Sequence, residues 1–122
     1  MKDFKVLIVD DEEELVTTIA ERLELRGIKT ITATDGKSAL DIIESDPPRV
    51  IVLDLMMPGI GGIEILKRID DRNLAIPVIL LTGYSASHPE LDQLKSKAFD
   101  ILIKPCDIST LMNKIQEAVK IN

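Results

Sequence analysis

The sequence is poor in aromatic residues and has no long apolar segment. It contains no tryptophan, one tyrosine and two phenylalanines in 122 residues, so its hydrophobic core must be built from aliphatic side chains. No apolar run approaches the about 20 residues that a membrane-spanning helix needs. The first residues carry charges at Lys2, Asp3 and Lys5 and lack the apolar region of a signal peptide. We therefore expect a cytoplasmic chain without a membrane partner.

Cysteine and positive charge are also scarce. Cys106 is the single cysteine, which excludes an internal disulfide and a cysteine-based metal cluster. Fifteen basic residues stand against twenty-one acidic ones, and the net charge is −6. Direct nucleic-acid binding is not expected from this chain, because neutralising phosphates requires a basic face. The length predicts one domain, spanning residues 1–122.

What the sequence does contain is a regular alternation of strand and helix patterns. Short apolar runs rich in β-branched residues predict five strands, at residues 6–9, 29–33, 50–53, 76–81 and 101–103. A helical pattern follows each strand. Gly27 closes the first helix, Asp46-Pro47-Pro48 ends the second, residues 87–90 begin the fourth, and Asp107 caps the fifth. The apolar face of the third is predicted at Ile63, Leu66 and Ile69, and Asp35-Gly36 is interpreted as a turn.

This alternation predicts an α/β fold with a parallel sheet covered by helices on both faces. Right-handed crossovers leave few topologies for such a chain. We expect a flavodoxin-like, doubly wound (βα)5 arrangement, with five strands in the order 2-1-3-4-5 and five flanking helices.

Polar side chains stand where four of these strands end. Asp10 and Asp11 follow the first strand, Asp54 the third, Thr82 the fourth and Lys104 the fifth. The carboxyl ends of parallel strands share one edge of the sheet, so these side chains can converge there. A hard divalent cation such as Mg²⁺ would relieve the repulsion among three carboxylates. With a lysine and a hydroxyl beside them, the group describes a phosphoryl acceptor in which Asp54 attacks in line.

Each residue also has an ordinary interpretation when it is taken alone. A single aspartate such as Asp54 usually caps a strand end or begins a turn. Asp10 and Asp11 could be the N-cap and first-turn acid of the following helix. Thr82 could belong to a turn, and Lys104 could be a solvated surface charge. The joint occurrence at several strand ends favours the functional interpretation.

With these residues, the chain resembles the receiver domain of bacterial two-component response regulators of the chemotaxis-regulator type. The resemblance covers its whole length. The resemblance rests on four motifs, which together are highly specific: Val9-Asp10-Asp11, the segment 54–59 (Asp-Leu-Met-Met-Pro-Gly) with Gly62, Leu81-Thr82-Gly83, and Lys104-Pro105.

The resemblance implies a role for each motif residue. Asp54 would be the phosphoacceptor. Asp11 and Asp54 would bind Mg²⁺ directly, Asp10 mainly through water, and the backbone carbonyl of Met56 would be a further ligand. Thr82 would be the switch hydroxyl, which moves onto the phosphoryl group. Lys104 would be the salt-bridging lysine, and the peptide bond before Pro105 would be cis.

Some positions depart from the family pattern. Ile101 stands where many members carry a switch tyrosine or phenylalanine, so aliphatic packing would have to replace the aromatic movement. Gly61 replaces a frequent aspartate, and Lys97 a frequent glycine, so that the end of the fourth helix would close differently. Met56 and Tyr84 occupy the two positions that tune the lifetime of the phosphoryl group in the family.

The resemblance implies a phosphorylation-activated signalling switch in a phosphorelay. The expected partners are a sensor histidine kinase or phosphotransfer protein, and an output domain or target on the face of helix 4, strand 5 and helix 5. A homodimer formed on phosphorylation is compatible with it. The chain would catalyse only its own phosphotransfer and dephosphorylation, and would not be an enzyme in the usual sense.

Two other classes compete with this expectation. An interaction module could keep the site and signal without phosphorylation. A hydrolase of small phosphorylated metabolites, similar to the haloacid dehalogenases, fits badly because Leu55-Met56-Met57 follows Asp54 and the second aspartate of that family is missing. His88 has no second histidine with which to form a metal site, and Cys106 is expected to be a half-buried apolar residue.

Overall fold

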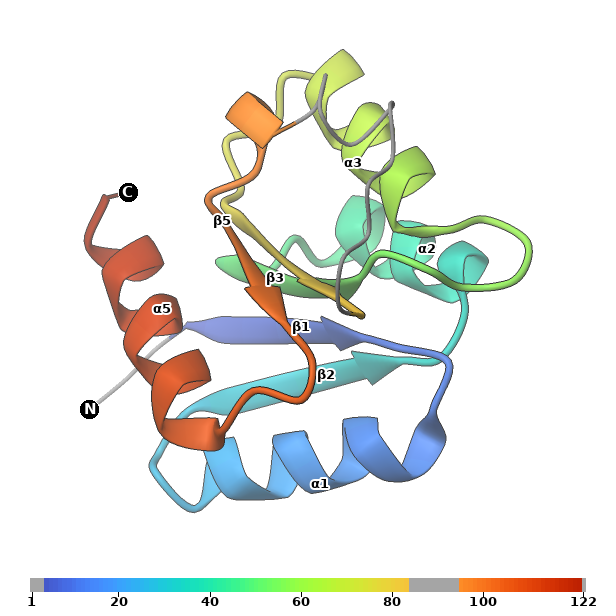
Figure 1. Ribbon diagram of the computed structural model, residues 1–122. Coiled ribbons are helices and arrows are strands. Elements are labelled where there is room, and N and C mark those ends of the chain that lie inside the picture. Colours follow the sequence, from blue (N-terminus) through green and yellow to red (C-terminus); the bar gives the residue numbers. More distant parts are fainter. Residues whose placement is uncertain (1–3, 84–94, 122) are drawn as a thin grey trace.

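The fold is a five-stranded parallel sheet between two layers of helices (Figure 1). It comes from a computed structural model, which describes residues 4–83 and 95–121. The strands are β1 (Lys5–Val9), β2 (Lys29–Ala33), β3 (Val50–Asp54), β4 (Val78–Thr82) and β5 (Asp100–Ile103). They lie in the order β2-β1-β3-β4-β5, and every neighbouring pair is parallel. The predicted topology and strand order are confirmed.

The described α-helices are α1 (Glu13–Glu24), α2 (Gly36–Ser45), α3 (Gly62–Asp71) and α5 (Ile108–Ile121), and a short 3₁₀ turn, η1, covers Lys95–Lys97. The helix predicted to begin at residues 87–90 lies outside the described residues. No helix in the described ranges is long and apolar enough to span a membrane.

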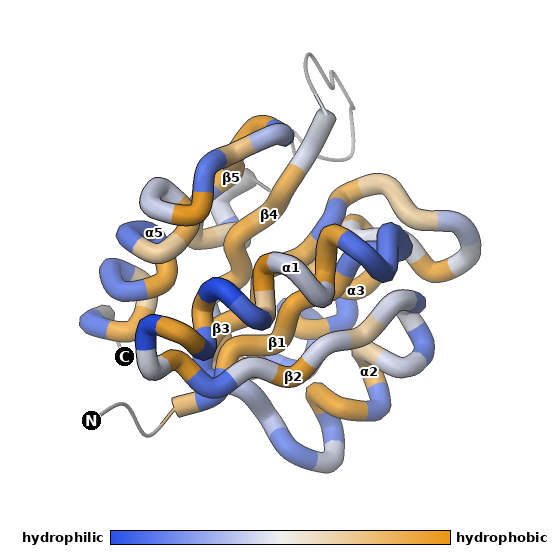
Figure 2. The backbone as a smooth tube through the Cα atoms, turned by 90° about the horizontal axis from the view of Figure 1, so that it is seen from below, coloured by the Kyte–Doolittle hydropathy of each residue, from blue (hydrophilic) through white to orange (hydrophobic). Residues whose placement is uncertain are grey.

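Successive side chains of the strands pack into two separate hydrophobic clusters, one on each face of the sheet. On β1, Leu7 and Val9 pack into a cluster with α2 and α3, whereas Val6 and Ile8 pack into a cluster with α1 and α5. Because a strand sends successive side chains to opposite faces, an unbroken apolar run is what a two-sided sheet requires. Figure 2 shows this pattern as continuous hydrophobic stretches along the inner strands. β3 lies at the centre, and all five of its residues are buried.

Several helix boundaries follow from local chemistry that the sequence indicates. Gly27 adopts a φ of 84° just after α1, and the Ile28 amide donates to the Leu23 carbonyl at 3.1 Å. This left-handed residue closes the helix as predicted. Asp46, before two prolines, ends α2, and the Asp107 carboxylate caps α5 by accepting from the Thr110 amide at 3.0 Å.

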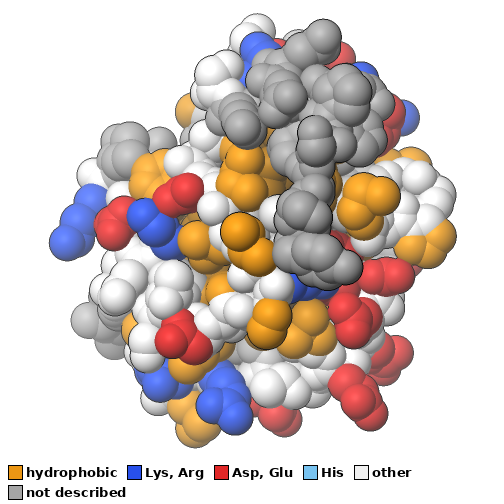
Figure 3. All heavy atoms as spheres, viewed as in Figure 1, with side chains coloured by type: hydrophobic (Ala, Val, Ile, Leu, Met, Phe, Trp, Pro, Cys, Tyr) orange, Lys and Arg blue, Asp and Glu red, His pale blue; other side chains and the backbone are white. Residues whose placement is uncertain are grey.

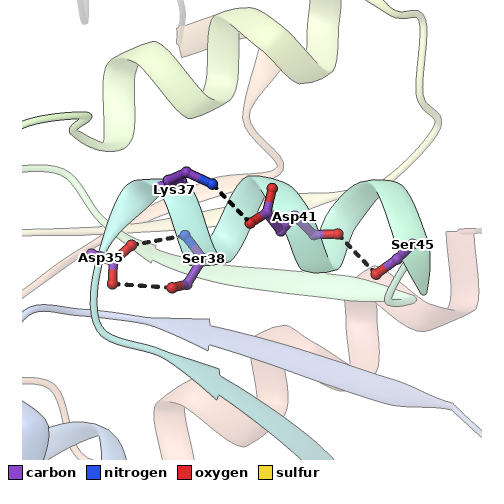
Figure 4. Close-up of polar contacts among 5 residues, drawn as sticks. All are labelled: Asp35, Lys37, Ser38, Asp41 and Ser45. Carbon is purple, nitrogen blue, oxygen red and sulfur yellow. Dashed lines mark hydrogen bonds and ion pairs between the residues drawn. The ribbon is translucent and has the colours of Figure 1, made fainter.

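Other local predictions need correction. The segment Asp35-Gly36 is not a free turn, because Asp35 is the N-cap of α2 and Gly36 its first residue. The Asp35 carboxylate accepts from the Ser38 amide at 2.7 Å and from the Ser38 hydroxyl at 3.1 Å (Figure 4). The fourth strand begins at Val78, two residues later than predicted, after Pro77. In α3, Ile65 is fully buried with Leu66 and Ile69, whereas Ile63 is half-buried.

Candidate functional site

Asp54 is the last residue of the central strand. Its neighbour in register on β4 is Leu81, and the Leu55 amide donates to the Leu81 carbonyl at 2.8 Å, so the strand is held to its end. The Asp54 side chain is buried, with only 5% of the residue exposed. A carboxylate is therefore fixed at the carboxyl edge of the sheet, where open α/β sheets place their ligands.

Asp10 lies at the end of β1 and is held on two sides. Its amide donates to the Ala33 carbonyl of β2 at 3.2 Å, and its Oδ1 accepts from the Glu12 amide at 3.0 Å. The residue is 1% exposed, whereas Asp11 is exposed. The N-cap position of α1 belongs to Glu12 and carries no side-chain cap, so neither Asp10 nor Asp11 is the N-cap residue.

The three aspartates form one cluster. Carboxylate oxygens of Asp10, Asp11 and Asp54 all lie within 4.8 Å of one another. All three offer the oxygen donors that Mg²⁺ prefers, and two of them are buried, so their mutual repulsion is weakly screened by water. Asp11 provides the side open to solvent. The donor set and its spacing therefore fit a hard divalent cation.

Lys104, which directly follows β5, forms ion pairs with two of these aspartates. Its Nζ lies 2.7 Å from Asp10 Oδ2 and 3.3 Å from Asp54 Oδ1. Its backbone amide donates to the Thr82 carbonyl at 2.7 Å, which extends the β4–β5 pairing to this point. The lysine side chain is 21% exposed. The predicted convergence of the strand-end residues is thus present in the structure.

Glu12 is a further member of the site that the sequence reasoning missed. Its Oε1 lies 3.5 Å from Lys104 Nζ, so three carboxylates share one ammonium group. The sequence signal for it is an acid directly after Asp10-Asp11, which does not stand at a strand end. Figure 3 shows acidic side chains gathered on the side of the molecule where α1 begins in Figure 1.

Burial and neighbouring charges shift the protonation equilibria of the two central groups. Burial raises the pKa of Asp54 above its ordinary value; the Asp10 charge adds to this, and Lys104 offsets part of it. Burial alone would lower the pKa of Lys104, but the hydrogen bond with Asp10 and the charge of Asp54 outweigh it and raise that pKa. Lys104 therefore stays protonated, beside an Asp54 carboxylate whose ionised form is disfavoured by burial.

Thr82 and the peptide bond before Pro105 complete the edge. Thr82 is 5% exposed, and its hydroxyl donates to the Gly83 carbonyl at 3.1 Å. The Lys104–Pro105 bond is cis, as the family resemblance implied. Ile101 is half-buried and packs against the core cluster of α2 and α3. Tyr84 lies outside the described residues.

The loop of residues 55–61 borders the site between β3 and α3. The Met56 side chain is 62% exposed. The Gly62 amide donates to the Leu55 carbonyl at 3.1 Å, which closes the base of the loop. Cys106 is half-buried, as predicted, and Lys97 does not have a positive φ. The η1 turn instead ends with Lys97 in an ion pair to Asp70 at 3.0 Å.

A doubly wound sheet with this acidic cluster, lysine and threonine at its carboxyl edge defines the class of protein, and sequence comparison agrees. Residues 6–116 match the response regulator receiver domain. The chain belongs to this family. The match includes all the strand-end residues described above.

Individual relatives agree with the family. The chain is 40% identical over 101 residues, 83% of its length, to the alkaline phosphatase synthesis transcriptional regulatory protein PhoP of Bacillus subtilis. It is 33% identical over 117 residues, 96% of its length, to the regulatory protein AtoC of Escherichia coli. The matched regions are 42% and 25% of those two proteins, so the chain spans less than half of either relative.

Solved structures share the fold closely. The receiver domain of the Francisella response regulator 1452 has a TM-score of 0.88 and 36% identity, covering 97% of this chain and 98% of that one. The structure of FixJ-N has a TM-score of 0.87 and 29% identity, covering 98% and 96% respectively. Both similarities extend across the whole five-stranded sheet and are consistent with two-component signalling.

Proposed function

We propose that Asp54 accepts a phosphoryl group from a partner histidine kinase, or from a phosphotransfer protein, in a Mg²⁺-dependent reaction. The observation that carries this proposal is the sharing of one lysine by buried Asp10 and Asp54, at 2.7 and 3.3 Å, within a cluster of three carboxylates. A phosphohistidine supplies the group: a bond forms between an Asp54 oxygen and phosphorus while the phosphorus–nitrogen bond breaks. The histidine nitrogen leaves with the bonding pair.

The charges around Asp54 suit this transfer. Asp10, Asp11, Asp54 and the Met56 backbone carbonyl would hold the metal, which when bound supplies charge neutralisation for the phosphoryl oxygens. Lys104 lies within reach of Asp54 and provides a second cation for those oxygens. Phosphorylation replaces the charge of the Asp54 carboxylate with the charges of the phosphoryl oxygens, which the metal and Lys104 would neutralise.

Thr82 would report the new group to the rest of the domain. Its hydroxyl donates to the neighbouring Gly83 carbonyl and can turn to donate to a phosphoryl oxygen instead. Ile101 on β5 pairs in register with Leu80 and packs against the core cluster of α2 and α3, so aliphatic repacking would accompany this turn. Met56 and Tyr84 would set the lifetime of the phosphorylated state by shielding it from water.

The partners follow from this role. Receiver phosphorylation would change the face of helix 4, β5 and α5, where an output domain or target protein, or a second copy of the chain, would bind. β5 is an edge strand, and Ile103 on it is 59% exposed. The net charge of −6 does not favour nucleic-acid binding by this domain itself. We propose that the protein is cytoplasmic and that residues 1–122 form one receiver domain. This domain would catalyse only its own phosphotransfer and dephosphorylation and would not otherwise be an enzyme.

Acetyl phosphate, with and without Mg²⁺, separates this role from that of an interaction module that does not use phosphorylation. Intact-protein mass spectrometry should show one added phosphoryl group only when Mg²⁺ is present, and amide NMR spectra should change at β4, β5 and α5. Beryllofluoride with Mg²⁺ should produce the same spectral change. A chain that stays unlabelled and spectrally unchanged under all these conditions would instead be the interaction module.

A further inference from the structure

The loop of residues 55–61 rests directly on the first residue of α2. A Cβ built on Gly36 would lie 2.3 Å from the Ile60 carbonyl oxygen, 2.6 Å from Ile60 Cβ and 2.8 Å from Ile60 Cγ2. Two of these three atoms branch from or belong to the loop backbone, so no side-chain rotation would remove the clash. Any side chain at position 36 would therefore displace the loop or the helix.

The helix is the less movable of the two partners. Asp35 fixes its first turn through hydrogen bonds from the Ser38 amide and hydroxyl (Figure 4). The next turns bury Ala39, Leu40 and Ile43 in the core. The loop, in contrast, projects from the sheet between β3 and α3 (Figure 1). A methyl group on Gly36 would thus push Ile60 by about 1 Å to restore an ordinary contact.

The junction of the loop with α3 is also closely packed, against the end of β3. A Cβ on Gly62 would lie 2.5 Å from the Asp54 carbonyl oxygen and 2.8 Å from Leu55 Cα. Gly62 therefore holds the α3 end of the loop against the end of β3, and Ile60, two residues earlier, rests on Gly36; Met56 lies between Leu55 and Ile60. Because Gly62 is held against Asp54 and Leu55, we expect a displacement at Ile60 to spread to the residues between Leu55 and Ile60, which include Met56.

We infer that Gly36 is a positioning residue for the metal site: its missing side chain lets Ile60 seat on α2 and so sets the loop that carries Met56. This inference rests on the proposed function, in which the Met56 carbonyl is a ligand. Mg²⁺ demands near-ideal octahedral geometry, so a ligand misplaced by about 1 Å is largely lost. In reactions that depend on precise orientation, misplacements of this size cost up to about 100-fold in rate.

The backbone of Gly36 itself does not require glycine. Positive φ values occur at Gly27 and Gly59 but not at Gly36 among the described glycines. On helix propensity alone, alanine at the start of α2 would stabilise the protein. Local helix propensity therefore predicts a more stable Gly36→Ala variant. A loss of Mg²⁺ affinity in that variant would come from the contact with Ile60.

The experiment compares metal-free and Mg²⁺-titrated protein by amide NMR and calorimetry. In Gly36→Ala we expect shifted amide signals for residues 56–61 before any metal is added, and a Mg²⁺ affinity about 10-fold weaker than in the wild type. Ile60→Gly removes two of the three clashing atoms, so the alanine should cost less affinity in the Ile60→Gly background than in the wild-type background. The matched control is Asp41→Gly, which weakens the same helix at an exposed position and should keep wild-type affinity.

The possible results separate cleanly. Unchanged affinity in a folded Gly36→Ala variant, or an equal loss in Asp41→Gly, overturns the inference while the proposed function stands. A wild-type protein that binds no Mg²⁺ overturns both. If Gly36→Ala does not fold, Ile60→Gly, which loses the side chain that rests on α2, is titrated instead. Shifted amide signals for residues 56–59 and weaker Mg²⁺ binding then support the inference, and wild-type signals and affinity overturn it.

Discussion

Two aspartates, Asp35 and Asp54, stand at the carboxyl ends of β2 and β3, which β1 separates in the sheet, yet their surroundings are opposite. Asp35 lies after β2 and accepts two hydrogen bonds from Ser38; the backbone hydrogen bond is the main cause of its lowered pKa. Asp54 ends β3, and burial followed by the charge of Asp10 raises its pKa. One carboxylate is stabilised as an anion by the helix it caps. The other is held where its charge is costly, which is the condition expected of a group that reacts or binds a cation.

The largest effect should come from the cation beside Asp54. Lys104→Ala should lower the rate of labelling by acetyl phosphate about 100-fold, because it removes one of the charges that stabilise the transferring group. Mg²⁺ binding should largely persist. Lys114→Ala is a suitable control, since Lys114 is a similarly shielded lysine that pairs with Asp100 away from the site. Equal losses in the two variants would show that a generic ion pair, not the site, is responsible.

The next effect concerns metal affinity and separates the two neighbouring acids. Asp11→Ala should weaken Mg²⁺ binding by roughly 100-fold and Asp10→Ala by roughly 10-fold, because Asp11 is proposed as a direct ligand and Asp10 as one acting through water. Calorimetric titration of each variant gives the comparison. Small and equal losses would contradict the ligand assignment.

The lifetime of the phosphorylated state should depend on the two shielding positions. The variant Met56→Asn/Tyr84→Ala should lose its phosphoryl group about 10-fold faster, because an amide can orient water in line and a smaller side chain admits it. The measurement is decay of labelled protein at fixed pH and Mg²⁺ concentration, beside the wild type. Unchanged or slower decay would mean that shielding does not set the lifetime.

The smallest effect is on stability and depends on pH. The raised pKa of Asp54 means that, as pH rises above about 3.8, the unfolded state loses this proton before the folded state does, so the ionised group destabilises the fold. In metal-free protein, Asp54→Asn should therefore have a higher Tm than the wild type at pH 7, and the difference should shrink towards pH 4. Asp35→Asn should show the opposite sign at pH 7, because the lowered pKa of Asp35 stabilises the fold when it is ionised. A pH-independent difference in the first variant would contradict the effect of burial.

Much of this architecture could be predicted because its signals are local. The unbroken apolar runs of β1 and β3 indicated a sheet covered on both faces, and polar residues at their ends indicated a shared edge. The cap formed by Asp35 was also local, an aspartate three residues before Ser38, but the following glycine suggested a turn instead. The start of β4 was displaced because the apolar run continues through Ile76 and Pro77 although the pairing assigned to the strand begins at Val78.

Contacts between distant segments could not be predicted in the same way. The approach of Ile60 to Gly36 depends on how the β3–α3 loop folds over another helix, which no local pattern records. The ion pair between Glu12 and Lys104 likewise joins residues that are 92 positions apart and depends on a side-chain orientation. The pattern of apolar and polar residues therefore predicts the fold, the strand order and the polar residues at the strand ends. The contacts that each side chain makes with distant segments depend on packing.

The most direct measurement compares phosphoryl labelling of Asp54→Asn, Asp35→Asn and the wild type by intact-protein mass spectrometry, with acetyl phosphate and Mg²⁺. Asparagine keeps the shape of each side chain, and it remains a good N-cap at position 35. The account predicts one phosphoryl group on the wild type and on Asp35→Asn, and none on Asp54→Asn. Full labelling of Asp54→Asn would contradict the assignment of Asp54 as the phosphoacceptor.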